Sequence, residues 1–351
     1  MIKVPANGTS RRNPSRRQFL GYAGGLALGG SFAGRLAAQA TDGSEGSPQD
    51  LLLVNGRIHT MDPARRVVSE VLVRNGRFTE VGENLTAPAG VERVDLGGRT
   101  VIPGLIDAHN HIVLVGNRPG WSTPIEHVFN IPDAVAALQA RSNEVPDGEF
   151  ITAIGPASAM QLAERRLPNL SELDAVGRAV YIQAAQGGTV TNTAGKSWLE
   201  ARGVMVGADG SLPRQSAGPA LLALREEFLT PETRQRSAED ALHYYARLGI
   251  TTHKDAGAFH SDQLSGGLAS ENTFTMHNPF LALHRARKMP ARLRIDFLHQ
   301  DPPDADPPLP TLSNRLKYSF PYFGDDWIRT GGIGEFTGGG IAGLRAIAVS
   351  R

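Results

Sequence analysis

The chain contains no cysteine among its 351 residues. This absence excludes disulfide-stapled scaffolds, thiolate metal sites and cysteine nucleophiles, because each of them requires the thiol side chain. Hydrophobic residues make up 40% of the chain and charged residues 20%, and both shares are ordinary for a soluble globular protein. The length exceeds that of one small domain and leaves room for a large barrel with an appendage.

Acidic residues are missing from residues 1–40, whereas this segment carries six lysine and arginine side chains. Arg16-Arg17 precedes a short, glycine-rich apolar run over residues 21–33, and a small-x-small cleavage site follows at 38–40. This order of features is typical of a bacterial twin-arginine signal peptide; the alternative is a basic disordered tail. We expect residues 1–40 to direct the folded protein to the periplasm or the exterior, with the twin-arginine export machinery as a partner.

Two further partner classes are excluded by what the chain lacks. The apolar run is too short and too rich in glycine to form a stable membrane anchor. Without residues 1–40 the 36 basic residues fall by six to 30 against 35 acidic ones, which leaves a formal charge of −5. The rest of the chain therefore has no basic field for nucleic acid and no basic amphipathic helix for a membrane surface.

The segment after residue 40 begins with a linker and a small β unit. Residues 41–50 are rich in glycine, serine and acidic side chains, as in a linker. Asn55-Gly56 separates two strand-like runs at 51–54 and 57–61, and Asn75-Gly76 separates two more at 67–73 and 77–81. Asn-Gly between apolar runs predicts a tight hairpin. We therefore predict a small antiparallel β unit over the two hairpins, residues 51–81, within a β portion that extends over residues 51–100.

The stretch VIPGLIDAHNHIV, residues 101–113, carries the strongest chemical signal. Its apolar first half predicts a strand that is buried on both faces, as in a parallel sheet. Residues two apart on a strand point the same way, so His109 and His111 share a face and can bind one cation, with nitrogen–zinc distances of about 2.0–2.1 Å. The pair lies at the carboxyl end of its strand, where α/β barrels place their chemistry. The alternative is two ordinary surface or core histidines.

The string PGLIDAHNH, together with the two Asn-Gly turns and Gly97-Gly98, resembles the amidohydrolase superfamily and, within it, the exported amidohydrolase-3-like branch. The resemblance implies an α/β fold, a partial (β/α)8 TIM-type metal-dependent hydrolase barrel with a small β-sandwich built from both chain ends. It implies that His109 and His111 are ligands of a divalent metal, zinc or a similar ion. The implied reaction is the hydrolysis of carbon–nitrogen bonds other than peptide bonds, in a small amide, carbamate or cyclic amide, by metal-activated water.

Further segments fit an incomplete amidohydrolase barrel over residues 101–340. Thr230-Pro231-Glu232 predicts a helix start, Gly249 its end, and a second barrel strand follows at 250–253. Residues 292–298 and 327–333 are the predicted third and fourth strands. Residues 150–155 and 179–184 are predicted strands of an insertion over about 145–228. The proline-rich residues 300–314 are a candidate lid or crossing segment.

Five other residues are candidates for the site or for its surroundings. The resemblance makes Glu335, after the fourth strand, a metal ligand; the alternative is an exposed loop glutamate. Asp107 is a candidate acceptor that orients His109 or His111; the alternative is a contact with the metal site itself. His253 either faces the substrate or is a packed or solvated histidine. His277 and His284 are seven residues apart, and we expect them to be solvated on one helix face.

The family pattern stops early in this sequence. The resemblance implies histidines on strands five and six and a general-base aspartate on strand eight, all of which would lie beyond Arg351. Residues 341–351 form a tail unlike the family. We therefore expect a C-terminally truncated chain with an unassigned catalytic base and no activity by itself. The alternative is a catalytically incomplete fragment or non-catalytic accessory protein of the same fold. The sequence specifies neither the substrate, the number of metal ions nor the oligomeric state.

Overall fold

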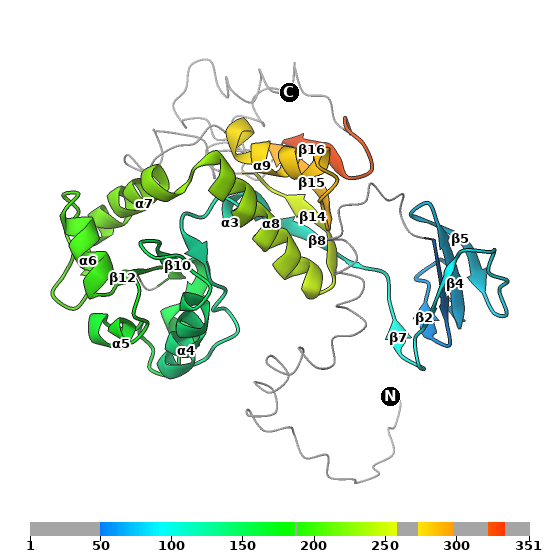
Figure 1. The fold of residues 1–351 in the computed structure, drawn as a ribbon, viewed down its shortest axis with the longest axis horizontal. Helices are drawn as coiled ribbons and strands as arrows, with labels where there is room; N and C mark the ends of the chain where they lie inside the picture. The colour runs from blue at the N-terminus through cyan, green and yellow to red at the C-terminus, as the bar shows by residue number, and fades with distance from the viewer. Residues whose placement is uncertain (1–49, 187, 258–272, 298–321, 334–351) are drawn as a thin grey trace, which may run out of the picture. The chain divides into compact units, whose positions relative to one another are not determined.

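The computed structural model describes residues 50–186, 188–257, 273–297 and 322–333. These residues form a mixed α/β protein with two compact units that divide between Pro103 and Gly104 (Figure 1). No helix in the described ranges has both the length and the apolar character needed to cross a membrane.

The N-terminal unit consists of two small sheets. The first has the order β5-β4-β1-β6 and the second the order β3-β2-β7. Ile58 of the second sheet and Val71 of the first belong to one buried apolar cluster, so the two sheets share a core. The strands are β1 (Leu51–Val54), β2 (Arg57–His59), β3 (Val67–Val68), β4 (Glu70–Arg74), β5 (Arg77–Gly82), β6 (Glu92–Asp95) and β7 (Thr100–Val101). A sandwich completed by the other chain end remains a prediction.

The structure confirms the hairpin at Asn75-Gly76. Strands β4 and β5 are antiparallel, with Arg74 opposite Arg77. Asn75 has φ 50° and Gly76 has φ 71°, and positive values at both central residues are the signature of the type I′ turn.

The predicted hairpin at Asn55-Gly56 is wrong. Strand β1 pairs with β4 and β6, whereas β2 pairs with β3 and β7 of the other sheet. Asn55 is left-handed, but Gly56 is not, so the type I′ geometry is absent. A Cβ on Gly56 would lie 2.4 Å from Leu96 Cδ1. Gly56 thus permits close packing where the chain passes between sheets.

The C-terminal unit contains a parallel sheet of four strands in the order β16-β15-β14-β8 (Figure 1). Its strands are β8 (Leu105–Asn110), β14 (Ile250–Asp255), β15 (Arg292–Phe297) and β16 (Ile328–Ile333). These positions confirm the predicted second, third and fourth strands. Neighbours in the sheet follow one another in chain order, as βαβ connections require. Closure into an eight-stranded barrel remains a prediction.

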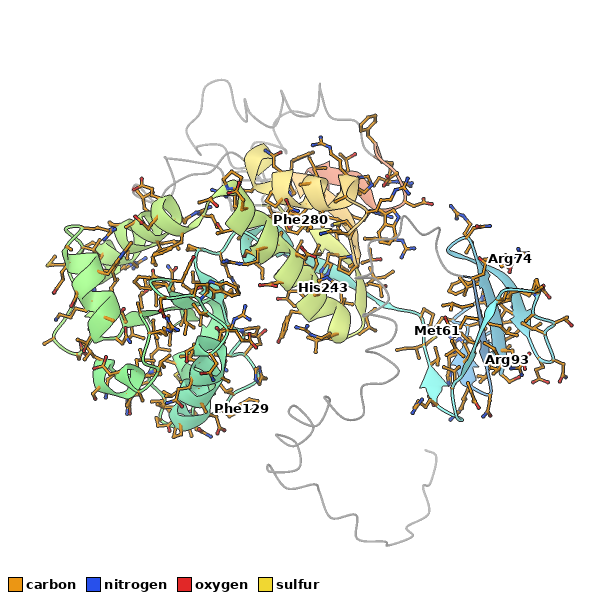
Figure 2. All side chains as sticks on the ribbon, viewed as in Figure 1. Met61, Arg74, Arg93, Phe129, His243 and Phe280 are labelled. Carbon is orange, nitrogen blue, oxygen red and sulfur yellow. The ribbon has the colours of Figure 1, made fainter. Side chains whose placement is uncertain are left out.

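Helices α3 (Ile112–Val115), α8 (Pro231–Arg247) and α9 (Thr273–Arg285) pack against this sheet. Phe280 of α9 and Leu242 of α8 are fully buried with Leu293 of β15, whereas His243 on the next position of α8 is exposed (Figure 2). The predicted helix start is confirmed, because the Thr230 hydroxyl accepts a hydrogen bond from the Thr233 amide. After α8, the left-handed Gly249 turns the chain into β14.

A second sheet in this unit has the order β13-β12-β11-β10-β9. Val180 and Ile182 pack into one apolar cluster and Tyr181 into another, so the sheet is covered on both faces. The predicted strands at 150–155 and 179–184 are confirmed as β10 and β11. The strands are β9 (Trp121–Ser122), β10 (Ile151–Ser158), β11 (Val180–Gln186), β12 (Thr189–Thr191) and β13 (Ser211–Leu212), and the helices are α4 (Ile131–Ser142), η2 (Ala159–Gln161), α5 (Leu170–Asp174), α6 (Thr193–Glu200) and α7 (Arg214–Phe228).

Candidate functional site

His109 and His111 lie at the carboxyl end of β8. Their ring centroids are 5.8 Å apart and the ring planes meet at 76°. His109 is exposed and His111 is half-buried at the start of α3. The structure therefore brings the two imidazoles together, as the spacing along a strand predicts.

A backbone carbonyl orients the His111 ring. His111 Nδ1 lies 2.7 Å from the oxygen of Gly257, just after β14. A carbonyl oxygen only accepts, so Nδ1 carries the proton and Nε2 of the neutral ring carries the lone pair. Metal-binding histidines are commonly held by such a bond on their other nitrogen. Sequence reasoning could not find this contact, because every residue has a backbone carbonyl. Gly257 has a left-handed φ of 83°, which explains why glycine occupies this position.

Asp107 contacts the backbone of the site. Its Oδ1 accepts a hydrogen bond of 3.2 Å from the His109 amide. This contact stabilises the end of β8, while the group that orients the His111 imidazole is the Gly257 carbonyl. A direct role of Asp107 toward either ring remains a prediction.

His253 is packed in the interior, with no exposed surface. Its Nδ1 accepts a hydrogen bond of 2.9 Å from the side-chain nitrogen Nδ2 of Asn110, the last residue of β8. Burial lowers the pKa of His253, and the negative charges of Asp107 and Asp255 offset only part of this effect. A neutral, enclosed imidazole matches the packed alternative better than the substrate-facing one.

Asp255 and His277 form a buried pair that the sequence analysis missed. His277 Nε2 lies 2.7 Å from Asp255 Oδ2, and the exposed fractions of the two side chains are 4% and 0%. Asp255 Oδ1 also accepts from the Val113 amide. The expectation of a solvated His277 is therefore wrong, because this face of α9 covers the end of β14. His284 is partly exposed and bonds to Asp325.

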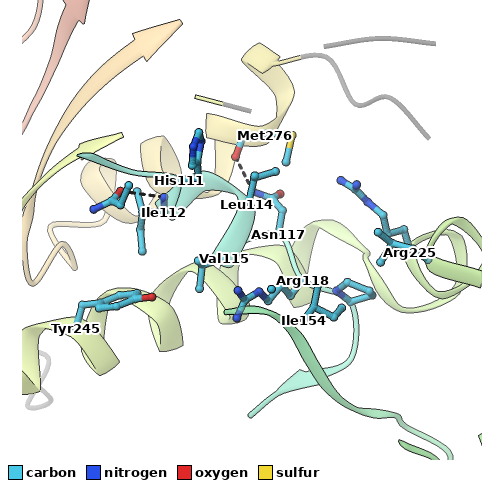
Figure 3. Close-up of a pocket in the computed structure, with 14 residues that line it drawn as sticks. His111, Ile112, Leu114, Val115, Asn117, Arg118, Ile154, Arg225, Tyr245 and Met276 are labelled. Carbon is cyan, nitrogen blue, oxygen red and sulfur yellow. Dashed lines mark hydrogen bonds between the residues drawn. The ribbon is translucent and has the colours of Figure 1, made fainter. Parts of the chain in front are cut away.

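A cavity of about 390 Å³ adjoins His111 (Figure 3). Its wall combines the β8–α3 segment with residues of α7, α8 and β10. Asn117 is fixed in the wall, because its Nδ2 donates to the carbonyls of Val113 and Met276 and its Oδ1 accepts from Arg234. The fourteen lining residues include His111, Arg118, Arg225 and Tyr245, and none of them is an aspartate or a glutamate.

The donor set at β8 fits part of a metal site. Two neighbouring imidazoles, one of them held with Nε2 as its lone-pair nitrogen, suit zinc and similar divalent ions. Within the described residues no group of three or more histidine, aspartate or glutamate side chains could hold a metal ion. The predicted third ligand, Glu335, lies outside the described residues, as does the predicted lid at 300–314.

Comparisons with known proteins identify the family. The sequence model of the amidohydrolase family matches residues 92–351. The chain is 30% identical over 135 residues to the N-substituted formamide deformylase of Arthrobacter pascens, covering 36% of this chain and 24% of that protein. It is 24% identical over 338 residues to Protein LONG AFTER FAR-RED 3 of Arabidopsis thaliana, covering 85% and 52%. A dihydroorotase of Pelobacter propionicus matches at 49% over 65 residues, covering 18% and 15%.

Among solved structures, an uncharacterized metal-dependent hydrolase from Pyrococcus horikoshii OT3 is similar, with 19% identity and a TM-score of 0.46. The match covers 81% of this chain and 54% of that one. The chain thus spans about half or less of the length of these relatives. The family match covers most of the sequence and confirms the superfamily that the PGLIDAHNH string resembles: this chain belongs to the amidohydrolase family.

Proposed function

We propose that this protein is a metal-dependent hydrolase of carbon–nitrogen bonds other than peptide bonds, with a small amide, carbamate or cyclic amide as substrate. The observation that carries the proposal is the His109–His111 pair beside a cavity, in a chain whose residues 92–351 match the amidohydrolase family. The name of one relative, an N-substituted formamide deformylase, supports this substrate class, because removal of a formyl group from nitrogen breaks a carbon–nitrogen bond.

His109 and His111 would hold the divalent metal, zinc or a similar ion, with Glu335 as a further ligand. Such an ion polarises a carbonyl oxygen and lowers the pKa of water. The Gly257 carbonyl keeps the lone pair of His111 on Nε2. Asp107 holds the backbone at His109. We assign none of these residues as the general base.

The cavity would position the rest of the substrate. Apolar side chains such as Ile112, Leu114 and Ile154 form much of its wall. They would exclude water around the scissile bond, and a drier site strengthens every electrostatic interaction in it.

A second candidate function is a catalytically incomplete fragment or a non-catalytic accessory protein of the same fold. The observation in its favour is the donor set, since among the described residues no group of three or more histidine, aspartate or glutamate side chains could hold a metal ion. Such a protein would still hold metal at His109 and His111 but would lack turnover.

One experiment separates these candidates. The purified 351-residue chain is dialysed against zinc, its metal content is measured, and it is assayed on N-formyl amines, N-acyl amino acids and cyclic amides. Turnover that requires zinc and is lost in His111→Ala supports the hydrolase. Zinc binding without turnover supports the second candidate. Equal zinc uptake by wild type and by His109→Ala/His111→Ala would refute both assignments of the metal; His127→Ala, which removes an exposed histidine, is the control.

We further propose that residues 1–40 direct export through the twin-arginine pathway, so that the protein works in the periplasm or outside the cell. The support is the order of Arg16-Arg17, the apolar run and the small-residue cleavage site. Assignment to the exported branch of the family rests on the same residues.

A further inference from the structure

Arg118 is half-buried and lies in the cavity wall, at the end away from His111 (Figure 3). Its hydrogen-bond partner is Ser122 Oγ at 3.4 Å, a long contact. Burial lowers the pKa of Arg118, and the negative charge of Glu126 opposes this effect. A guanidinium keeps its charge in proteins, so burying part of it without an ion pair, as among the described residues, is unfavourable unless an anion joins it.

Glu126 does not supply that anion within the described structure. Its Oε1 accepts a hydrogen bond of 2.9 Å from the Tyr244 hydroxyl. Glu126 and Arg118 both line a neighbouring cavity, but Glu126 does not line the cavity at His111. In the described part of the chain no carboxylate forms a salt bridge with Arg118, although many other arginines have such partners.

Gly155 leaves room for the Arg118 guanidinium, because glycine has no side chain. A Cβ at this position would lie 2.6 Å from Arg118 Nη2, which is closer than Cβ contacts occur. Gly155 also has a φ of 109°, which side chains rarely adopt. A larger residue would therefore displace the guanidinium from the cavity wall.

Tyr245 of α8 supplies a second donor on the same wall (Figure 3). Burial raises the pKa of Tyr245, and Arg118 offsets only part of this effect, so the hydroxyl keeps its proton. The cavity also includes Arg225, and none of its lining residues is acidic. The Arg118 guanidinium, the Tyr245 phenol and an otherwise largely apolar wall are complementary to an apolar molecule with one anionic group.

We propose that Arg118 is the group that recognises a carboxylate of the substrate. The substrate class is then a small apolar amide or cyclic amide that carries a carboxylate, with its carbon–nitrogen bond toward His111. A carboxylate is preferred over other anions because the planar fork of arginine matches its two oxygens. The position of the scissile bond rests on the proposed function, whereas the recognition of the carboxylate does not.

The test is a binding measurement on the full 351-residue chain by titration calorimetry. The probes are N-acetyl-leucine and N-acetyl-leucinamide, which differ in charge but hardly in shape, and inorganic phosphate. We expect wild type to bind the acid roughly ten- to a hundredfold more tightly than the amide, which corresponds to one or two charge-assisted hydrogen bonds.

Arg118→Gln should reduce the preference for the acid to about onefold while the amide still binds, which shows that the cavity is intact. Arg118→Lys should retain part of the preference, and Gly155→Ala should weaken it by displacing the guanidinium. Arg202→Gln, which removes an exposed arginine bonded to Glu227, should change nothing.

Three results would overturn the proposal. The first is equal affinity of wild type for the acid and the amide, which includes no binding of either. The second is a preference for the acid that survives Arg118→Gln. The third is tighter binding of phosphate than of the acid. Failure to hydrolyse any amide would count against the proposed function alone, because the acid–amide preference is measured without turnover.

Discussion

Removal of the Asp255 carboxylate should strongly destabilise the C-terminal unit. Asp255 has no exposed surface, and its two oxygens accept hydrogen bonds from Val113 of α3 and His277 of α9. Asp255→Ala leaves both donors buried without that acceptor. Breaking a buried pair of this kind costs about 3–5 kcal/mol of folding free energy. The shape-conserving Asp255→Asn keeps an acceptor for one of the donors and should cost less, about 1–3 kcal/mol.

Tryptophan fluorescence during urea unfolding measures this loss selectively. All three tryptophans of the chain, Trp121, Trp198 and Trp327, follow Gly104 and so report on the C-terminal unit alone. His284 lies on α9, as His277 does, but it is partly exposed and pairs with Asp325 outside this helix. His284→Ala is therefore the matched control, with an expected loss of about 0–1 kcal/mol.

A double-mutant cycle tests the cause of the loss. If Asp255 and His277 act as one unit, the losses of Asp255→Ala and His277→Ala should fail to add, with a coupling of about 1–3 kcal/mol. Additive losses, or an Asp255→Ala loss no larger than that of His284→Ala, would refute the reasoning.

The remaining predictions concern other parts of the chain. Arg16-Arg17→Lys-Lys should retain the precursor in the cytoplasm, and normal periplasmic accumulation on a fractionation blot would contradict the export signal. The hydrogen bond from Arg166 lowers the pKa of Glu172 to about 2, so its stabilisation should be full above pH ~4.5 and lost as the pH falls toward ~2. Because this pair is partly exposed, Glu172→Gln should cost only about 1 kcal/mol at pH 7 in urea unfolding, and an equal loss at pH 2 would contradict the assignment. Gly76→Ala should lower the free energy of unfolding of the N-terminal unit by about 1 kcal/mol, because φ is 71° at this position. Thermal unfolding followed by circular dichroism checks this, and equal unfolding temperatures of wild type and variant would contradict the left-handed turn.

Local patterns determined the elements whose signals lie in adjacent residues. The strands β14, β15 and β16 and the start of helix α8 were predictable from apolar runs and from capping residues. A strand before the two histidines was also predictable, but the expectation that it is buried on both faces is wrong, because Leu105 and Ile106 of β8 are exposed. The turn at Asn75-Gly76 was predictable because its two residues adopt left-handed conformations at low cost. The same strand alternation explains why the two imidazoles meet.

The tertiary structure decided everything that depends on residues far apart in the chain. Gly56 lies in a close contact with Leu96 rather than in a hairpin, which its Asn-Gly sequence does not reveal. His277 is buried because Asp255, 22 residues away, ends a strand beneath α9. The carbonyl of Gly257 orients His111 without any side-chain signal. Arg118 reads as an ordinary charged residue in the sequence, because desolvation arises only when Gly155 and Tyr245 are brought around it.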